Sequence, residues 1–205
     1  MDVAPYITAF VTLFVIVDPV GLAPLFVALT AGMDARHRRA IAIRATLIGM
    51  GLLTLFGLLG EALLNVVGIS MPAFRIAGGI LLFLTALDML FERRKKRRED
   101  QASHVDDPSV FPLATPLIAG PGALATMILL TGQSPDDAGW IAAVHAVMAA
   151  VMAVTFVFFL AAGLIERALG PTGINVVTRL LGMLLAALSV QFVLDGLRAV
   201  GLSPS

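Results

Sequence analysis

Two long stretches, each interrupted near its middle by proline and glycine, dominate the hydrophobicity pattern of the chain. Between residues 3 and 33 the only charged side chain is Asp18, which opens the motif Asp18-Pro19-Val20-Gly21. Between residues 108 and 135 there is no charged residue, and the middle reads Ala119-Gly120-Pro121-Gly122. A helix that spans a bilayer needs about 20 residues, and irregular backbone at that depth is tolerated only inside protein or beside a cavity. The two breaks are therefore candidate binding sites.

Further apolar segments extend this pattern along the whole chain. The predicted spans cover residues 5–30, 41–67, 73–91, 111–132, 140–165 and 176–198. Hydrophobic residues make up 59% of the chain and charged residues 14%, whereas soluble domains have roughly 25% charged residues. The predicted fold class is all-α and integral to the membrane, with residues 1–205 forming a single membrane domain of six transmembrane helices.

The basic residues are concentrated on one predicted side of the membrane. A continuous basic run from Arg93 to Arg98 follows the third span. If the loop 92–108 is cytoplasmic, alternation of the spans puts every Lys and Arg except Arg75 and Arg198 on the cytoplasmic side, as the positive-inside rule requires. Both termini are then predicted to lie outside. Beside a span, such a run is typical of topology control and of anionic-lipid binding, rather than of nucleic-acid binding.

The two halves of the chain resemble each other. The first half, 1–91, and the second half, 109–205, are joined by the basic loop, and each contains three spans. Matching residues occur in the same order in both halves, Pro19, Glu61 and Arg75 corresponding to Pro121, Glu166 and Arg179. Because three is odd, the second half must enter the membrane in the opposite sense, which predicts two inverted-topology repeats with a broken first helix in each. Paired broken helices recur in secondary transporters, where the substrate binds near the midplane.

The chemistry of the two breaks differs. Asp18 followed by Pro19 is an N-cap residue followed by proline at the first helical position, which is how a new half-helix begins. Gly120 followed by Pro121 predicts a second helix start, but glycine has no side-chain oxygen for the first-turn N–H groups. An anion suits a bare helix N-terminus. A zwitterion with its ammonium near Asp18 and its carboxylate near Gly120 and Gly122 would satisfy both breaks, which describes a neutral amino acid.

The candidate substrate-binding residues lie at the breaks and on two later helical positions: Asp18, Pro19, Gly21, Gly120, Pro121, Gly122, Thr126 and Gln191. Asp18 is also the candidate site for a coupling ion, H⁺ or Na⁺, because an ionisable group at the bilayer centre is costly and is functional by default. Two alternatives stay open. Asp18 could merely cap a kinked helix while the glycines allow tight packing, and the Thr126 hydroxyl could bond to its own helix.

Several function classes find no support in the sequence. There is no cysteine, and His145 stands alone in its span, so no metal site and no cofactor is predicted. The zinc-protease, serine-elbow and intramembrane aspartyl motifs of enzymes are absent from the sequence, so no enzyme activity is expected. The leading hypothesis is a secondary transporter for uptake or export of small neutral amino acids or similar small metabolites. The alternative is a non-transporting membrane scaffold or accessory protein.

The residues of the two breaks carry a family resemblance. Asp18-Pro19-Val20-Gly21-Leu22-Ala23-Pro24-Leu25-Phe26 and Ile118-Ala119-Gly120-Pro121-Gly122-Ala123 resemble the motifs of the MarC family of six-span inner-membrane proteins. That family includes a transporter of small neutral amino acids. The resemblance covers essentially the whole chain and implies a multi-pass protein of a bacterial or archaeal cytoplasmic membrane. Members often have Asn where this chain has Leu22.

Overall fold

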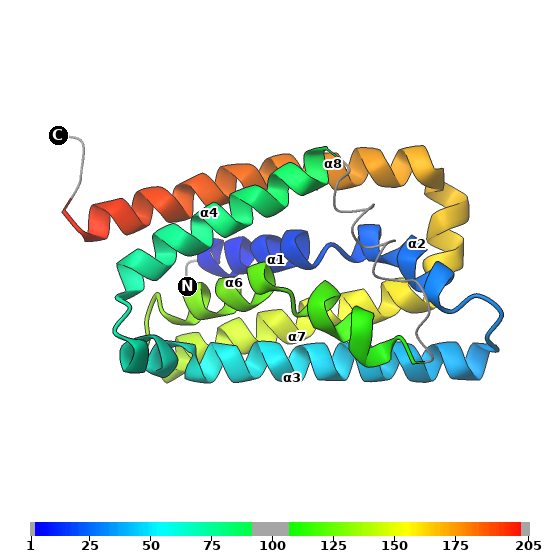
Figure 1. Ribbon diagram of the computed structural model, residues 1–205, viewed down its shortest axis with the longest axis horizontal. Coiled ribbons are helices and arrows are strands. Elements are labelled where there is room, and N and C mark those ends of the chain that lie inside the picture. The colour runs from blue at the N-terminus through cyan, green and yellow to red at the C-terminus, as the bar shows by residue number, and fades with distance from the viewer. Residues whose placement is uncertain (1–2, 92–106, 202–205) are drawn as a thin grey trace.

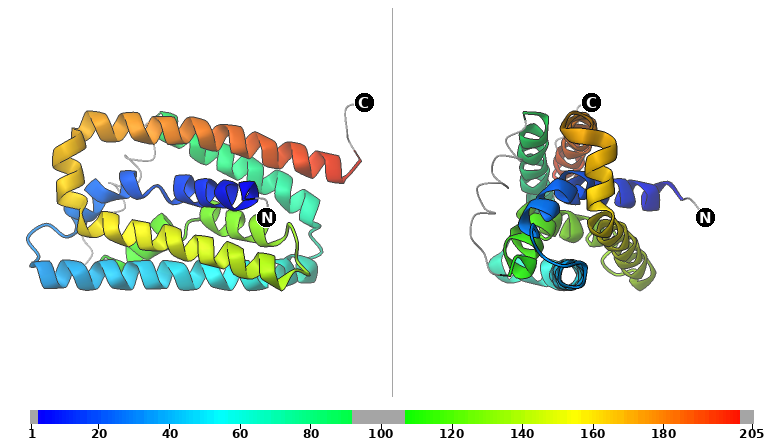
Figure 2. Two further views of the ribbon diagram at one scale, coloured as in Figure 1. Left: turned by 180° about the vertical axis from the view of Figure 1, so that it is seen from behind. Right: turned by 90° about the vertical axis from the view of Figure 1, so that its right-hand side faces the viewer.

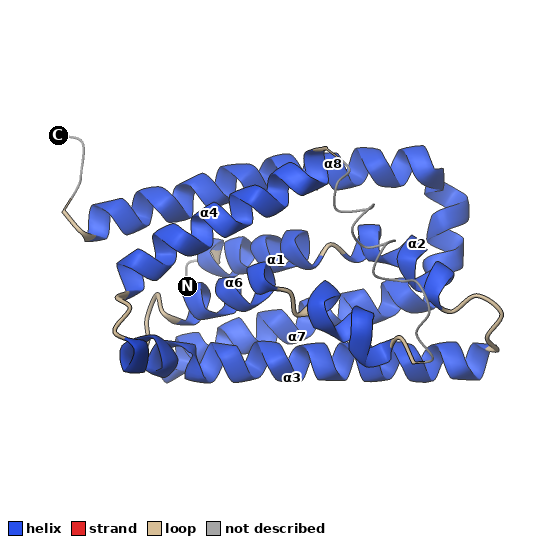
Figure 3. Cartoon of the chain, in the orientation of Figure 1, coloured by secondary structure: helices blue, strands red, loops and turns tan. Residues whose placement is uncertain are grey.

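The computed structural model of the chain describes residues 3–91 and 107–201, and within those ranges it contains helices and no strand. The helices lie in one elongated bundle (Figure 1 and Figure 3). Their bounds are α1 (Ala4–Val17), α2 (Pro19–Leu29), α3 (Ala35–Val67), α4 (Met71–Leu90), η1 (Ser109–Ile118), α6 (Pro121–Thr131), α7 (Ala138–Leu160) and α8 (Ala162–Ala199). The basic run from Arg93 to Arg98, and the loop 92–108 up to residue 106, lie outside the described residues.

The predicted spans are present as apolar helices or helix pairs. Five are long and apolar enough to cross a bilayer singly, namely Ala4–Leu29, Ala35–Val67, Met71–Leu90, Ala138–Leu160 and Ala162–Ala199. The sixth is the pair η1 and α6, whose axes are bent by 54° at their break. The predicted all-α membrane fold class is thereby confirmed.

The last two spans differ from their predicted bounds of 140–165 and 176–198. α7 already ends at Leu160, and α8 begins at Ala162. Within α8, Gly170 has φ 61° and ψ 175°, a conformation that favours glycine, and Pro171 follows it. α8 therefore consists of a short helical segment, hereafter the short rod, and a long segment, which meet at Gly170. The short rod crosses one end of the bundle, at the right of Figure 1.

The first broken helix occupies the interior of the bundle. In the most apolar stretch of α1 and α2, 67% of the residues are buried, against 28% for α3, α4 and α8. Large apolar side chains are exposed on the outer helices, including Leu58 on α3, Leu84 on α4 and Leu180 on α8. Such an extensive apolar surface is unfavourable in water, whereas in a bilayer it faces hydrocarbon.

Glycines bring α4 and α8 into close contact. A Cβ on Gly79 would lie 2.8 Å from the carbonyl oxygen of Ser189, and a Cβ on Gly182 would lie 3.3 Å from that of Ala86. Small residues allow this backbone approach between membrane helices. The contacts are reciprocal, because positions 79 and 182, like 86 and 189, are 103 residues apart. A twofold axis between the helices would produce this relation; the inverted repeat itself stays a prediction.

A glycine face of α3 receives the second broken helix. A Cβ on Gly49 would lie 2.6 Å from Ile118 Cγ2 of η1, and one on Gly57 would lie 2.9 Å from Met127 Cε of α6. Substituting either glycine would therefore displace a side chain of the broken helix. This face positions η1 and α6 along α3.

Candidate functional site: two helix breaks in the interior of the bundle

Asp18 ends α1 and begins α2. Its backbone is left-handed, with φ 57° and ψ 63°, and it is the only residue other than glycine with a positive φ in the described part of the chain. Its N–H donates to the Phe14 carbonyl at 2.9 Å, and its Oδ1 accepts from the Gly21 N–H at 3.0 Å. The side chain therefore caps α2, and the predicted helix start at Asp18 and Pro19 is present. Asp18 is 0% exposed.

Gly21 is needed beside this cap. A Cβ at position 21 would collide with the Asp18 carboxyl group, whose Cγ would be 2.8 Å away. The carboxyl group thus occupies the space that a side chain at position 21 would require. Leu22, which follows Gly21, is fully buried.

The second break has a different geometry. η1 is irregular, because Phe111 and Thr115 have extended backbones and each precedes a proline, which disfavours the helical conformation. Its last turn closes with the Ala119 N–H donating to the Ala114 carbonyl at 2.9 Å. Gly120 then has an extended backbone, with φ −78° and ψ 168°, and α6 begins at Pro121.

Gly120 fits a tight turn but provides no cap. A Cβ on Gly120 would lie 2.5 Å from the backbone oxygen of Pro116, so a side chain there would force the backbone to move. The first turn of α6 receives no side-chain hydrogen bond from its N-cap residue. Gly120 therefore supplies no carboxylate to offset the positive end of the α6 dipole, whereas Asp18 supplies one to α2.

The structure brings the two breaks together. A Cβ on Gly122, in the first turn of α6, would lie 2.9 Å from Cδ1 of Ile16, and Ile16 is separated from Asp18 by a single residue. Both breaks lie near the middle of the long axis in Figure 1 and in the left view of Figure 2. Pro19 is buried, whereas Pro121 is exposed, so one edge of the second break reaches the surface.

The two predicted polar side chains on later helices do not supply free groups to this centre. Thr126 is fully buried, and its hydroxyl donates to the Gly122 carbonyl at 2.8 Å, which is the back-bonding alternative. Gln191 is exposed on α8, and its Nε2 donates to Asp195 Oδ1 at 2.8 Å. The structure does not bring Gln191 to the breaks, because it faces outward while the breaks lie in the bundle.

Two aromatic contacts, which sequence reasoning did not pair, lie toward opposite ends of the bundle. Tyr6 on α1 and Trp140 on α7 have ring centroids 5.6 Å apart, and Trp140 Nε1 donates to the Leu130 carbonyl of α6 at 2.8 Å. Phe26 on α2 stacks on Phe159 of α7, with centroids 4.6 Å apart and planes at 10°. These contacts join the start of α1 and the end of α2, the two ends that lie away from the break, to α7.

The Phe26 ring also contacts the positively charged side chain of Arg38. The Arg38 guanidinium carbon lies 5.9 Å from the centre of the Phe26 ring, a cation–π distance. The sequence motif that begins at Asp18 includes Phe26, but no local sequence pattern connects position 26 with position 159. The pairing could be found only from the three-dimensional arrangement.

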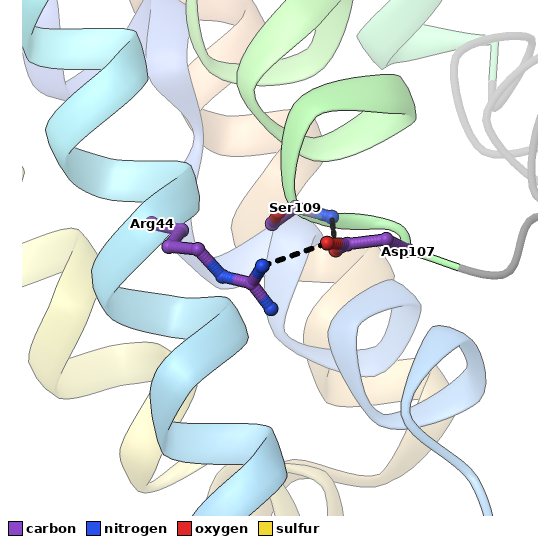
Figure 4. A network of polar contacts seen from close by, with 3 residues as sticks. All are labelled: Arg44, Asp107 and Ser109. Atoms are coloured by element: carbon purple, nitrogen blue, oxygen red, sulfur yellow. Dashed lines mark hydrogen bonds and ion pairs between the residues drawn. The ribbon is translucent and has the colours of Figure 1, made fainter.

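A polar network anchors the start of η1 to α3 (Figure 4). Arg44 Nη1 lies 2.8 Å from Asp107 Oδ2, and Asp107 Oδ1 accepts from the Ser109 N–H at 3.0 Å. The side chain and the backbone N–H of Ser109, followed by the Arg44 guanidinium, hold the pKa of Asp107 below its ordinary value. In residues 3–91 and 107–201, no three His, Cys, Asp or Glu side chains are grouped as a metal site would require.

Comparison with known proteins identifies the family. Residues 3–200 match the MarC family integral membrane proteins. A UPF0056 membrane protein of Archaeoglobus fulgidus is 38% identical over 205 residues, covering 96% of each chain. The UPF0056 inner membrane protein YhgN of Escherichia coli strain K12 is 37% identical over 194 residues, covering 94% of this chain and 95% of the relative. The UPF0056 membrane protein YvbG of Bacillus subtilis is 37% identical over 200 residues, covering 93% of each.

No solved structure matches the chain. The relatives are named as membrane proteins, and the helices have the length and composition of membrane spans. The sequence match extends over nearly the whole length of both partners in each comparison, so it includes both broken helices. The chain is a multi-pass membrane protein and belongs to the MarC family.

Proposed function

We propose that the protein is a secondary transporter of small neutral amino acids or similar small zwitterionic metabolites. The observation that carries the proposal is the adjacency of two unlike helix starts inside the bundle. One start holds the buried Asp18 carboxyl group, and the other is the N-terminus of α6, which Gly120 leaves without a side-chain cap. An ammonium group complements the first and a carboxylate complements the second. A small zwitterion carries both groups.

The buried position of Asp18 supports a cycle in which access alternates. Because Asp18 is 0% exposed, a substrate can reach it only after a rearrangement. The Phe26 and Phe159 stack joins α2 to α7 on one side of Asp18, and the Tyr6 and Trp140 contact joins α1 to α7 on the other side. In the proposed cycle each contact opens in turn, and Asp18 takes up the coupling H⁺ or Na⁺. Movement of one repeat against the other is the usual basis of alternating access.

The proposed orientation follows from the basic residues. Arg36, Arg38 and Arg39 lie in the first turns of α3, at the same end of the bundle as the end of α2. We place this end in the cytoplasm. Single cysteines introduced into the otherwise cysteine-free chain test it. Ala31→Cys should react with an impermeant thiol reagent only from the cytoplasmic side, and Gln133→Cys only from the opposite side; the reverse pattern would contradict the orientation.

Counterflow in proteoliposomes tests the function. Vesicles containing the purified protein are loaded with one unlabelled amino acid, and entry of the labelled compound is followed, with and without H⁺ or Na⁺ gradients. Glycine, alanine and serine should accumulate transiently, whereas glutamate, lysine and tryptophan should not. Absence of counterflow across the whole panel would contradict the proposal.

A non-transporting scaffold is the second candidate, and one observation favours it: Asp18 already has a structural role as the cap of α2. Gly120→Leu would not separate the two functions, because the backbone oxygen of Pro116 leaves no room for a Cβ in either case. Counterflow by the wild type separates them, because a non-transporting scaffold would show none. If the wild type transports, Asp18→Asn, which keeps a capping oxygen and loses only the charge, tests whether the carboxylate does more than cap α2.

A further inference from the structure

The first turn of α6 is covered by hydrocarbon from two other helices. At the position that a Cβ on Gly122 would occupy, Ile16 Cδ1 of α1 is 2.9 Å away and Leu82 Cδ2 of α4 is 3.5 Å away. Ile16 is 2% exposed and Leu82 is fully buried. The two side chains therefore pack directly against Gly122 in the first turn of the helix that Gly120 leaves without a side-chain cap.

This cover is stiff as well as close. Ile16 is β-branched and lies inside α1, so it has one strongly preferred side-chain rotamer. Gly122 contributes no side chain of its own, and Ala123, the next residue, is also buried and small. Beside Gly122, the atoms that a molecule at the α6 start would meet are therefore those of Ile16 and Leu82 rather than side chains of α6.

From this geometry we infer that Ile16 and Leu82 determine which substrates fit, by limiting the size of the substituent on the substrate's α-carbon. The inference rests on the proposed function. A carboxylate held at the first turn of α6 carries its α-carbon next to these two side chains. Glycine, alanine and serine, with the smallest substituents on that carbon, should then be accepted, and the larger side chains of valine or leucine should meet Ile16. One methylene in an apolar site changes discrimination by roughly 10-fold to 200-fold.

Truncation of Ile16 tests the inference in the counterflow assay. Ile16→Ala should raise the ratio of valine transport to alanine transport by about 10-fold or more, and Ile16→Val, which removes one methyl group, should raise it less. Leu82→Ala should shift the ratio in the same direction. Ile41→Ala is the matched control, because Ile41 is 1% exposed but lies near the start of α3. It loses the same atoms from the core and should leave the ratio unchanged.

Each outcome bears on a different statement. If the wild type moves no amino acid, the proposed function fails, and the inference fails with it. If the wild type transports alanine and both Ile16 variants keep its valine-to-alanine ratio, only the inference is overturned. An equal shift in Ile41→Ala would also overturn it, since the effect would then come from loosened packing anywhere in the bundle.

A stability measurement tests the contact without any transport. Gly122→Ala places a Cβ against Ile16 Cδ1 and should lower the thermal midpoint of the detergent-solubilised protein. In the Ile16→Ala background the same substitution should lower the midpoint less or raise it, because the obstructing methyl group is absent. Equal effects in both backgrounds would contradict the assignment of Ile16 as the cover of the α6 start.

Discussion

The two helix breaks are built from similar residues but expose opposite chemistry. The first is closed by its own side chain: Asp18 adopts a left-handed backbone, caps α2 and fills the space beside Gly21. The second has no cap of its own, follows the irregular η1 and is covered by side chains of α1 and α4. Proline starts a helix at either break. The residue before the proline makes the difference. Asp18 gives the start of α2 a carboxyl group, whereas Gly120 leaves the first N–H groups of α6 without a side-chain acceptor of its own.

The largest expected effect comes from removing the charge of the first break. Asp18→Asn keeps an oxygen for the Gly21 N–H, and asparagine tolerates the left-handed backbone. Transport should fall on the order of 100-fold, since a buried ammonium group would lose its partner. The thermal midpoint should change little. Counterflow and thermal unfolding of the same preparation measure the two quantities.

Thr126→Val is the matched change at the second break. It removes a buried hydroxyl that bonds to Gly122 of its own helix, and it keeps the shape of the side chain. Transport should stay near the wild-type level. If Asp18→Asn and Thr126→Val lost transport equally, the loss could not be attributed to the charge of Asp18.

Added methyl groups should distinguish the two breaks by stability. Gly21→Ala meets the Asp18 side chain, whereas Gly120→Ala meets the Pro116 backbone. Each should destabilise the protein by about 1–3 kcal/mol. Asp18→Gly, which tolerates the left-handed backbone, should relieve Gly21→Ala in the double variant but should not relieve Gly120→Ala. Equilibrium unfolding in mixed detergent micelles gives the free energies.

Gly51→Ala is the control for these substitutions, because no atom lies within 4 Å of the added Cβ. Alanine is favoured over glycine inside a helix by about 1 kcal/mol. This variant should therefore match or exceed the wild type in stability. If Gly21→Ala behaved like Gly51→Ala, the carboxyl group would not occupy the space assigned to it.

The smallest effect concerns the anchor of the second break. Arg44→Gln removes the ion pair with Asp107, whose side chains are 48% and 47% exposed. Solvent screening limits the loss to about 0.5 kcal/mol or less. Because the pKa of Asp107 is lowered in the folded protein, its contribution is present above the unfolded pKa of about 3.9. It is lost as the pH falls through the lowered value.

Unfolding measured at a series of pH values checks the sign of this effect. The difference between the wild type and Arg44→Gln should vanish at the acid end and reach its full size near neutral pH. When Asp107→Asn is present in both proteins, the effect of Arg44→Gln should no longer depend on pH. A difference that grows toward acid pH would show that Arg44 acts through another group.

Local chemistry made much of the fold and the break positions predictable. Capping by Asp18 depends on residues within one turn, so the motif predicts the start of α2, and glycine before Pro121 predicts a helix start without a side-chain cap. The spans follow from composition. The bounds of α7 and α8 were wrong because the apolar run continues past Leu160, although the backbone turns there. Apolar residues alone do not mark a change of direction inside a membrane.

What could not be predicted depends on contacts between distant segments. Gln191 was selected for its place along a span, but position along a span does not say which face of the helix is buried. The stack of Phe26 on Phe159, and the cover of Gly122 by Ile16 and Leu82, join residues on different helices. No period in the sequence encodes such pairs.

The contact between α4 and α8 restricts how the bundle can deform. A Cβ on Gly79 would lie 2.7 Å from Val193 Cγ2 and 2.8 Å from the Ser189 carbonyl oxygen, and one on Gly182 would lie 3.0 Å from Met89 Cβ. The two helices therefore have little space between them at these glycines. This contact joins the first half of the chain to the second, so in the proposed transport cycle the two halves would move about it rather than separate there. In that proposed cycle, the half-helices α2 and α6, which begin at Pro19 and Pro121, are the elements expected to change their angle.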